Sequence, residues 1–149
     1  MHIKQQIHAH YIDTINSKIL MLQQTLADLK ESGSNETKST AGDKHETALA
    51  MLQIEQANTR AQLHDAQEQR SVLIIINPDI ITKKIMSGSY VKTNKGNFYI
   101  CVALGKMIID GETVTAISPK SPLGAKLMGR CVHDTVTINT HTYLVISIE

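Results

Sequence analysis

The sequence predicts an α+β protein in which an N-terminal antiparallel α-helical coiled-coil hairpin precedes a small antiparallel-sheet domain with one short helix. Three observations support this prediction. Apolar residues recur every three or four positions between residues 12 and 66, as they do on amphipathic helices. One polar stretch interrupts this pattern. Beyond residue 77, short β-branched runs alternate with turn residues, which is typical of strands. The predicted domains are residues 1–76 and 77–149.

The first helix is predicted from Ile3 to Glu31 because its apolar positions follow a heptad pattern with polar residues between them. At 1.5 Å per residue it would be about 40 Å long. A helix of that length with a narrow apolar stripe needs a partner to cover the stripe. The apolar positions of the stripe are Ile12, Ile15, Ile19, Leu22, Leu26 and Leu29.

The partner is predicted from Asp43 to Arg70, after a helix end at 32–35 and a polar loop at 36–41. Gln56 is a polar interruption in its stripe. A short connection favours an antiparallel hairpin, and parallel self-association of two chains is the alternative. The remaining positions of this second stripe are Leu49, Leu52, Thr59, Leu63 and Ala66.

The second half of the chain is predicted to be a sheet. The β-branched run 72–76 is interpreted as a strand that ends at the domain boundary. Three turns, at 94–97, 110–112 and 139–141, separate pairs of short apolar runs and so predict three hairpins.

One short helix, 122–128, is predicted within this second half. Ser121 suits its N-cap, Pro122 its first position, and Gly129 the residue beyond its end.

Composition narrows the functional classes. The chain has 149 residues, a net charge of +1, 42% hydrophobic residues, 3% aromatic residues and no Trp. The shortage of aromatics argues against a base-stacking nucleic-acid platform, and the low charge against a general basic field. No apolar run approaches the ~20 residues of a membrane helix, and residues 1–10 do not form a signal-peptide core. We therefore expect a soluble, cytoplasmic protein.

The cysteines and histidines do not form an evident site. Cys101 and Cys131 are expected to be reduced, mostly buried thiols because they form no CxxC pair. His8 and His10 are two residues apart and would not share a helix face, so a metal site there is not expected. His45 is expected to be solvated. Three basic residues are expected to be solvated charges, with a basic patch as the alternative: Lys120, Lys126 and Arg130.

The stretch between the two helices carries two carboxylates, Asp43 and Glu46, three residues apart. This spacing places both on one helix face, with β-carbons about 5–6 Å apart. Mg²⁺ is a hard cation that takes one or two carboxylates and keeps several waters. The same pair at a helix start also resembles a capping box, so helix capping is the alternative role.

Two motifs resemble the Gre family of bacterial transcript-cleavage factors. Residues 42–47 read Gly-Asp-Lys-His-Glu-Thr, similar to the family's Gly-Asp-x-x-Glu-Asn tip. Residues 117–130 read Ile-Ser-Pro-Lys-Ser-Pro-Leu-Gly-Ala-Lys-Leu-Met-Gly-Arg, similar to its Ser-Pro-x-Ser-Pro-Ile/Leu-Gly…Leu-x-Gly stretch. The resemblance extends from the first helix to the last strand.

The resemblance implies an FKBP-like C-terminal domain that docks at the mouth of the secondary channel of RNA polymerase, with Ser121, Pro122 and Leu123 in the docking segment. It implies that the coiled coil enters the channel and that Asp43 and Glu46 help the polymerase to bind a catalytic Mg²⁺. Backtracked RNA is then cleaved from its 3′ end. The chain would be a monomeric accessory factor among the DNA-binding regulators of transcription elongation, with no enzyme activity or cofactor of its own and no membrane partner.

The sequence departs from the family after the tip. Residues 47–50 read Thr-Ala-Leu-Ala where the family continues Asn-x-Glu-Tyr, and His133-Asp134 replaces a Gly-Asp. A polymerase channel binder that modulates transcription without cleavage is therefore the alternative function. Two further alternatives are a prolyl isomerase, which the scarcity of aromatics disfavours, and a coiled-coil adaptor or dimer.

Overall fold

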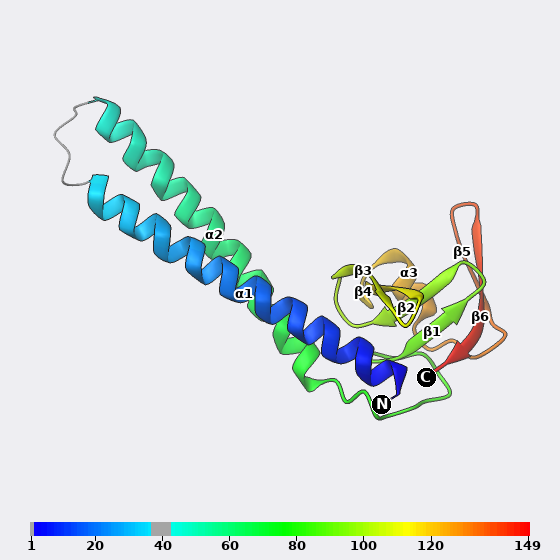
Figure 1. Ribbon diagram of the computed structural model, residues 1–149. Helices are drawn as coiled ribbons and strands as arrows, with labels where there is room; N and C mark the ends of the chain where they lie inside the picture. The colour runs from blue at the N-terminus through cyan, green and yellow to red at the C-terminus, as the bar shows by residue number, and fades with distance from the viewer. Residues whose placement is uncertain (1, 37–42) are drawn as a thin grey trace. The chain divides into compact units, whose positions relative to one another are not determined.

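The computed structural model describes residues 2–36 and 43–149, and the side chains of 2–34 and 46–149 (Figure 1). The predicted loop at 36–41 lies outside these residues except for Glu36, which ends the first helix. The order of elements confirms the predicted α+β class. The elements are α1 (Ile3–Glu36), α2 (Asp43–Ile75), β1 (Tyr90–Thr93), β2 (Gly96–Ile100), β3 (Gly105–Ile109), β4 (Glu112–Ile117), α3 (Pro122–Leu127), β5 (Thr135–Ile138) and β6 (His141–Ile148).

The chain forms two compact units. Asp13–Arg70 forms the hairpin unit, and Met1–Ile12 joins Ser71–Glu149 in the sheet unit. The sheet unit thus includes the first turns of α1 and the last turn of α2. The division into domains at residue 76 stays a prediction.

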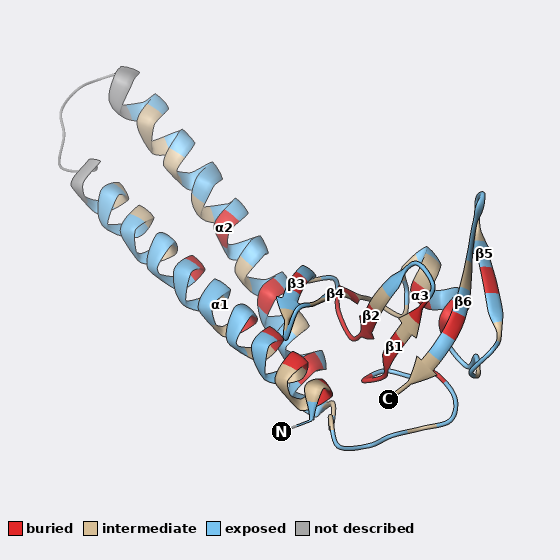
Figure 2. Ribbon diagram, turned by 45° about the vertical axis from the view of Figure 1, so that its right-hand side comes forward, coloured by how far each residue is buried: buried red, intermediate tan, exposed pale blue. Residues whose placement is uncertain are grey.

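In the hairpin unit, α1 and α2 run antiparallel, as predicted. The Gln56 amide donates to the Leu29 carbonyl at 3.2 Å, and the Arg70 guanidinium donates to Asn16 Oδ1 at 2.7 Å. Residue number falls along α1 as it rises along α2, which is the antiparallel order. Both predicted stripes face inward (Figure 2), and their most buried members are Ile15, Leu22, Thr59 and Ala66. The polar interruption at Gln56 is therefore accommodated by a hydrogen bond across the hairpin.

Both helices are longer than predicted. The helix end at 32–35 is wrong, because α1 continues to Glu36. A glycine in a helix costs about 1 kcal/mol relative to alanine, and Gly33 lies where a β-carbon would be 3.4 Å from the Gln56 amide nitrogen. Gly33 therefore lies against α2, and this contact between the helices offsets the low helix propensity of glycine.

The predicted strand at 72–76 is also wrong, because α2 includes residues 72–75. Leu73 is fully buried, whereas Ile74 and Ile75 are 52% and 80% exposed. Leu73 follows Ala66 by seven residues, so it continues the apolar stripe of the helix. Burial of one side of the run decides its conformation, and helix propagation overrides the β propensity of its residues.

The sheet has the strand order β3-β4-β2-β1-β6-β5. The three predicted hairpins are confirmed as antiparallel pairs: β1 with β2, β3 with β4, and β5 with β6. One pair differs from the expected antiparallel sheet, because β2 and β4 are parallel from Asn97↔Val114 to Ile100↔Ile117. The hairpin partner β3 lies on the outer side of β4, so β4 returns beside β2 in the same direction.

The two faces of the sheet are covered differently. On one face, Val91, Phe98 and Ile100 join Leu127 of α3 in a buried core. On the other face lies Tyr99, which contacts Tyr11 from the first turns of α1. The sheet is therefore enclosed by a short C-terminal helix and by the N-terminal end of the first helix.

Candidate functional site

The predicted acidic tip lies at the start of α2. The helix begins at Asp43, as predicted, and Glu46 is exposed in its first turn. The side chains of Asp43 and His45 lie outside the described residues. Acidic residues are favoured at this end of a helix by the partial positive charge of its unpaired N–H groups.

The described side chains include no evident metal centre. Within the described residues, no group of three or more His, Cys, Asp or Glu side chains is arranged to hold a metal ion. A pair of carboxylates matches the one or two that Mg²⁺ takes from a protein. The shared Mg²⁺ site at Asp43 and Glu46 stays a prediction.

The residues after the tip continue into the hairpin. Thr47 is exposed, and Ala48 and Leu49 are half-buried. Leu49 and Leu52 line a shallow groove of about 370 Å³ together with residues of α1. Leu49 therefore borders this groove and adds no carboxylate to those of Asp43 and Glu46.

The predicted docking segment begins with a capped turn. The Ser121 hydroxyl donates to the Ser118 carbonyl at 2.7 Å and accepts from the Gly124 N–H at 3.0 Å. The Ser118 hydroxyl accepts from the Lys120 N–H at 3.1 Å. These bonds confirm Ser121 as the N-cap of α3, with Pro122 as its first residue. The Ser-Pro-x-Ser-Pro pattern therefore has a local structural explanation.

Gly124 completes this turn by close approach. A β-carbon at Gly124 would lie 2.0 Å from the Ser118 carbonyl oxygen, which excludes any side chain. Leu123 is half-buried against the sheet core, whereas Pro122 and Lys120 are exposed. Of the three residues predicted to contact a partner, Ser121 and Leu123 shape the turn and Pro122 presents its side chain to the surface.

Two of the three basic residues near this turn bind backbone carbonyls. The Lys126 ammonium donates to the Thr137 carbonyl at 2.6 Å, and the Arg130 guanidinium donates to the Lys126 carbonyl at 3.3 Å. All three residues, including Lys120, are exposed. The first contact ties α3 to β5 and the second is local to the end of α3, so neither singles out a basic binding patch.

The cysteines are free, as predicted. Cys101 is buried, and burial raises the pKa of its thiol to about 12. Cys131 is half-buried, so it is the more accessible thiol.

His8 and His10 lie in different environments. His8 Nδ1 lies 2.8 Å from the Tyr99 hydroxyl, and burial, with a smaller contribution from the nearby Lys4 ammonium, lowers the pKa of His8. His10 is exposed. They lie on different sides of α1, in agreement with the prediction that they do not share a face.

Sequence reasoning missed a pocket at the start of α1. Its polar groups include Lys4 and Glu149, 145 positions apart in the chain. Lys4 is only 3% exposed, which is rare for a lysine. Nothing in the local pattern signals this, because the two residues meet only through the tertiary fold.

None of the described helices is both long enough and apolar enough to cross a membrane.

No protein-family model matches the sequence, and no curated protein matches it. Among solved structures, the transcription factor Gfh1 aligns with 92% of this chain and 92% of its own, at 17% sequence identity and a TM-score of 0.40. This similarity establishes neither a shared family nor a shared activity.

Proposed function

We propose that this chain is an accessory transcription factor that binds bacterial RNA polymerase, inserts its helical hairpin into the secondary channel, and presents Asp43 and Glu46 to the active site. The main observation in support of this proposal is the antiparallel hairpin, in which the first turn of α2 contains an acidic pair. Residues 13–36 of α1 lie in the hairpin unit, which corresponds to about 36 Å at 1.5 Å per residue. A hairpin of this length carries charge far from its base.

The two carboxylates are suited to assisting hydrolysis. When bound, a divalent ion lowers the pKa of water and polarises a phosphoryl oxygen. Glu46 is exposed, so its carboxylate is accessible to an ion held mainly by a partner. Asp43 precedes it by three residues in the sequence, a spacing that favours one helix face. Their role in this proposal is to add negative ligands to the polymerase's own active site; this chain alone would not be an enzyme.

The sheet unit supplies the proposed docking surface. The turn before α3 is held by bonds from Ser121 to Ser118 and Gly124, so its exposed Pro122 is presented on a rigid support. A preorganised turn loses little conformational freedom on binding. We assign Pro122 to polymerase contact, and Ser121 and Leu123 to holding the turn.

A second function is favoured by the residues after the tip. Leu49 packs within the hairpin, and the stretch Thr47-Ala48-Leu49-Ala50 offers no further carboxylate or aromatic side chain. In this alternative, the chain occupies the channel and modulates the polymerase without stimulating cleavage.

Binding and cleavage are tested separately. Purified polymerase is immobilised, and retention of the chain is measured. A stalled, backtracked elongation complex with 3′-labelled RNA is then incubated with the chain, and release of short 3′ fragments is followed. The proposal expects retention and fragments. Retention without fragments supports the modulating alternative, and the absence of retention contradicts both.

Substitutions at the two tip carboxylates test their proposed role in cleavage. The double substitution Asp43→Asn with Glu46→Gln is expected to reduce the cleavage rate at least tenfold while binding remains. Glu55→Gln, an exposed acid further along α2, is the matched control and should cleave like the parent. Equal cleavage by the double variant and the parent contradicts the tip mechanism.

A separate substitution tests the assignment of Pro122 to polymerase contact. Pro122→Ala is expected to weaken polymerase binding while the free energy of unfolding changes by no more than about 1 kcal/mol, because the side chain is exposed. Unchanged binding would show that this surface is not the contact.

A further inference from the structure

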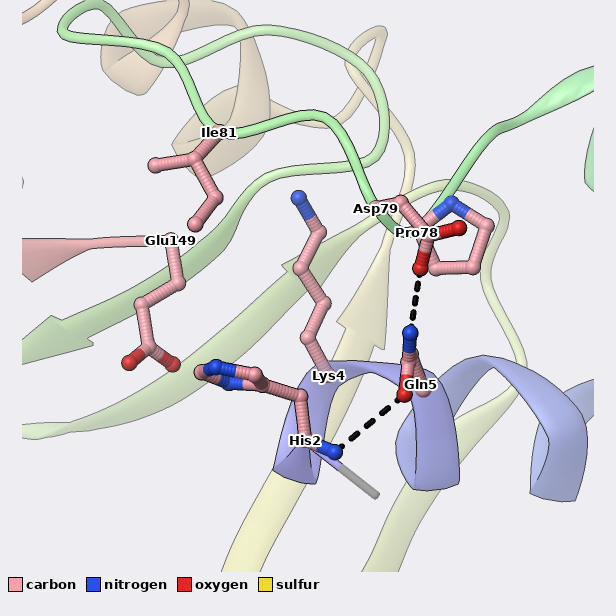
Figure 3. A pocket seen from close by; sticks show the side chains of 7 residues that line it. All are labelled: His2, Lys4, Gln5, Pro78, Asp79, Ile81 and Glu149. Atoms are coloured by element: carbon pink, nitrogen blue, oxygen red, sulfur yellow. Dashed lines mark hydrogen bonds between the residues drawn. The ribbon is translucent and has the colours of Figure 1, made fainter.

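A pocket of about 350 Å³ lies in the sheet unit, between the start of α1, the segment after α2 and the residue that follows β6 (Figure 3). Its walls combine charged, amide and apolar side chains. The lining residues are His2, Lys4, Gln5, Pro78, Asp79, Ile81 and Glu149. The volume is at the lower end of the range for small-molecule sites.

The Glu149 carboxylate has one buried oxygen that the fold leaves without a hydrogen-bond donor. Its backbone is fixed, because Glu149 N–H donates to the Tyr90 carbonyl at 2.9 Å and Tyr90 N–H donates to the Glu149 carbonyl at 2.8 Å. Its Oε2 atom is buried and accepts no hydrogen bond from any described residue. A buried acceptor without a donor costs about 1–3 kcal/mol, so the site favours a molecule that supplies one.

The neighbouring polar groups are engaged with one another. The Lys4 ammonium donates to the Ile80 carbonyl at 2.6 Å. The Gln5 amide accepts from the His2 N–H at 3.2 Å and donates to the Asp79 carboxylate. Figure 3 shows the Lys4 side chain rising between Glu149 on one side and Asp79 on the other. Two carboxylates therefore share the charge of one ammonium.

We propose that this pocket binds a small organic cation whose ammonium or guanidinium N–H donates to the Glu149 carboxylate, with the aliphatic part against Pro78 and Ile81. The formal charge of the lining, two carboxylates against one ammonium with histidine neutral, attracts a cation. A metal ion is disfavoured, because no metal-binding group of three His, Cys, Asp or Glu side chains exists within the described residues. The volume equals that of roughly a dozen water molecules at ~30 Å³ each, so the ligand is small.

This site is independent of the proposed polymerase binding, since it uses neither the acidic tip nor the turn before α3. Its test is therefore a binding measurement on the full chain without polymerase. The backbone amides are followed by NMR during titration with butylammonium, butylguanidinium and the neutral butan-1-ol. Saturable shifts at Lys4, Gln5, Asp79 and Ile81 are expected with either cation, and none of similar size with the alcohol.

Variants test the donor–acceptor contact itself. Glu149→Gln keeps the shape of the side chain and removes its charge, so the cation dissociation constant is expected to rise at least tenfold. Glu68→Gln, an exposed acid of the hairpin unit, is the matched control and should leave it unchanged. The proposal is overturned if the parent shows no saturable shifts, if the shifts lie elsewhere, or if butan-1-ol binds equally well. The parent titration decides the matter even if the Glu149 variant does not fold.

Discussion

Tyr11 and Tyr99 stack with their ring centroids 6.3 Å apart and their planes 7° from parallel. Tyr11 belongs to α1, and Tyr99 to β2 in the centre of the sheet. The Tyr11 hydroxyl also donates to the Gly105 carbonyl at 2.8 Å and lies within hydrogen-bond distance of the Val114 carbonyl at 3.2 Å. One side chain thus joins the first helix to three strands of the sheet unit.

We expect Tyr11→Phe to lower the free energy of unfolding by about 1–2 kcal/mol, because the ring stays and two carbonyls lose their donor. Urea unfolding followed by circular dichroism measures this change. Tyr143→Phe is the control, because Tyr143 is half-buried and packs by its ring edge against Phe98. Equal stability of the Tyr11 variant and the parent would show that these bonds add nothing.

Gly124→Ala is expected to destabilise the sheet unit by about 2–3 kcal/mol, since the new β-carbon would overlap the Ser118 carbonyl oxygen at 2.0 Å. Ala125→Ser, at an exposed position of the same helix, is the control and should cost about 0.5 kcal/mol. Thermal unfolding compares the two. A Gly124 variant as stable as the control would contradict the close approach.

The two thiols should react at very different rates. Burial raises the pKa of Cys101 to about 12, so almost no reactive thiolate exists near neutral pH. Cys131 is half-buried and more accessible. Brief treatment with iodoacetamide, followed by peptide mass spectrometry, should label Cys131 first, and both in urea. Faster labelling of Cys101 in the folded chain would contradict its burial.

Stability should fall in alkaline solution. Burial raises the pKa of Cys101 to about 12 from 9.0 and that of Tyr11 to about 12 from 10.0. Between about pH 9 and pH 12 the unfolded chain has released these protons and the folded chain has kept them. The unfolded state then binds fewer protons, so the free energy of unfolding decreases as pH rises through this window. The stabilising contribution of these two groups is fully present below about pH 9.

The alkaline effect is measured as the urea midpoint at about pH 8, 9.5 and 11. Cys101→Ala removes one of the groups, so the midpoint should fall less steeply with pH. Cys131→Ala is the control and should retain the parent slope. A midpoint independent of pH across this window would be inconsistent with neutral, buried groups.

Gln56→Leu is expected to raise the stability of the hairpin unit by about 1 kcal/mol. The substitution loses the hydrogen bond to the Leu29 carbonyl, worth about 0.5–1.5 kcal/mol, and an exposed one that Arg60 donates to Gln56 Oε1 at 3.2 Å. It adds about 1.5–3 kcal/mol of apolar burial if the leucine packs fully. Thermal unfolding measures the change. Gln53→Leu, at an exposed neighbouring position, is the control and should gain less; a loss of stability at residue 56 would show that the amide contact dominates.

The local features of the fold were predictable because their causes are local. The capped start of α3 follows from Ser121, whose hydroxyl accepts the Gly124 N–H. The turn at Asp110-Gly111 follows from two residues that tolerate positive φ, 48° and 79°. The conformation of 72–76 was mispredicted, because the burial of Leu73 on one side of the run depends on the tertiary fold.

The candidate sites also include features with local causes and features that depend on the tertiary fold. The heptad stripes and the Ser-Pro turn are properties of neighbouring residues, so the hairpin and the turn could be predicted from the sequence. The role of Asp43 and Glu46 stays a prediction. The parallel pairing of β2 with β4 and the pocket of Lys4 and Glu149 were decided only by the tertiary structure. Both join segments distant in the chain, and such contacts form only where the core packing of the sheet unit brings the segments together.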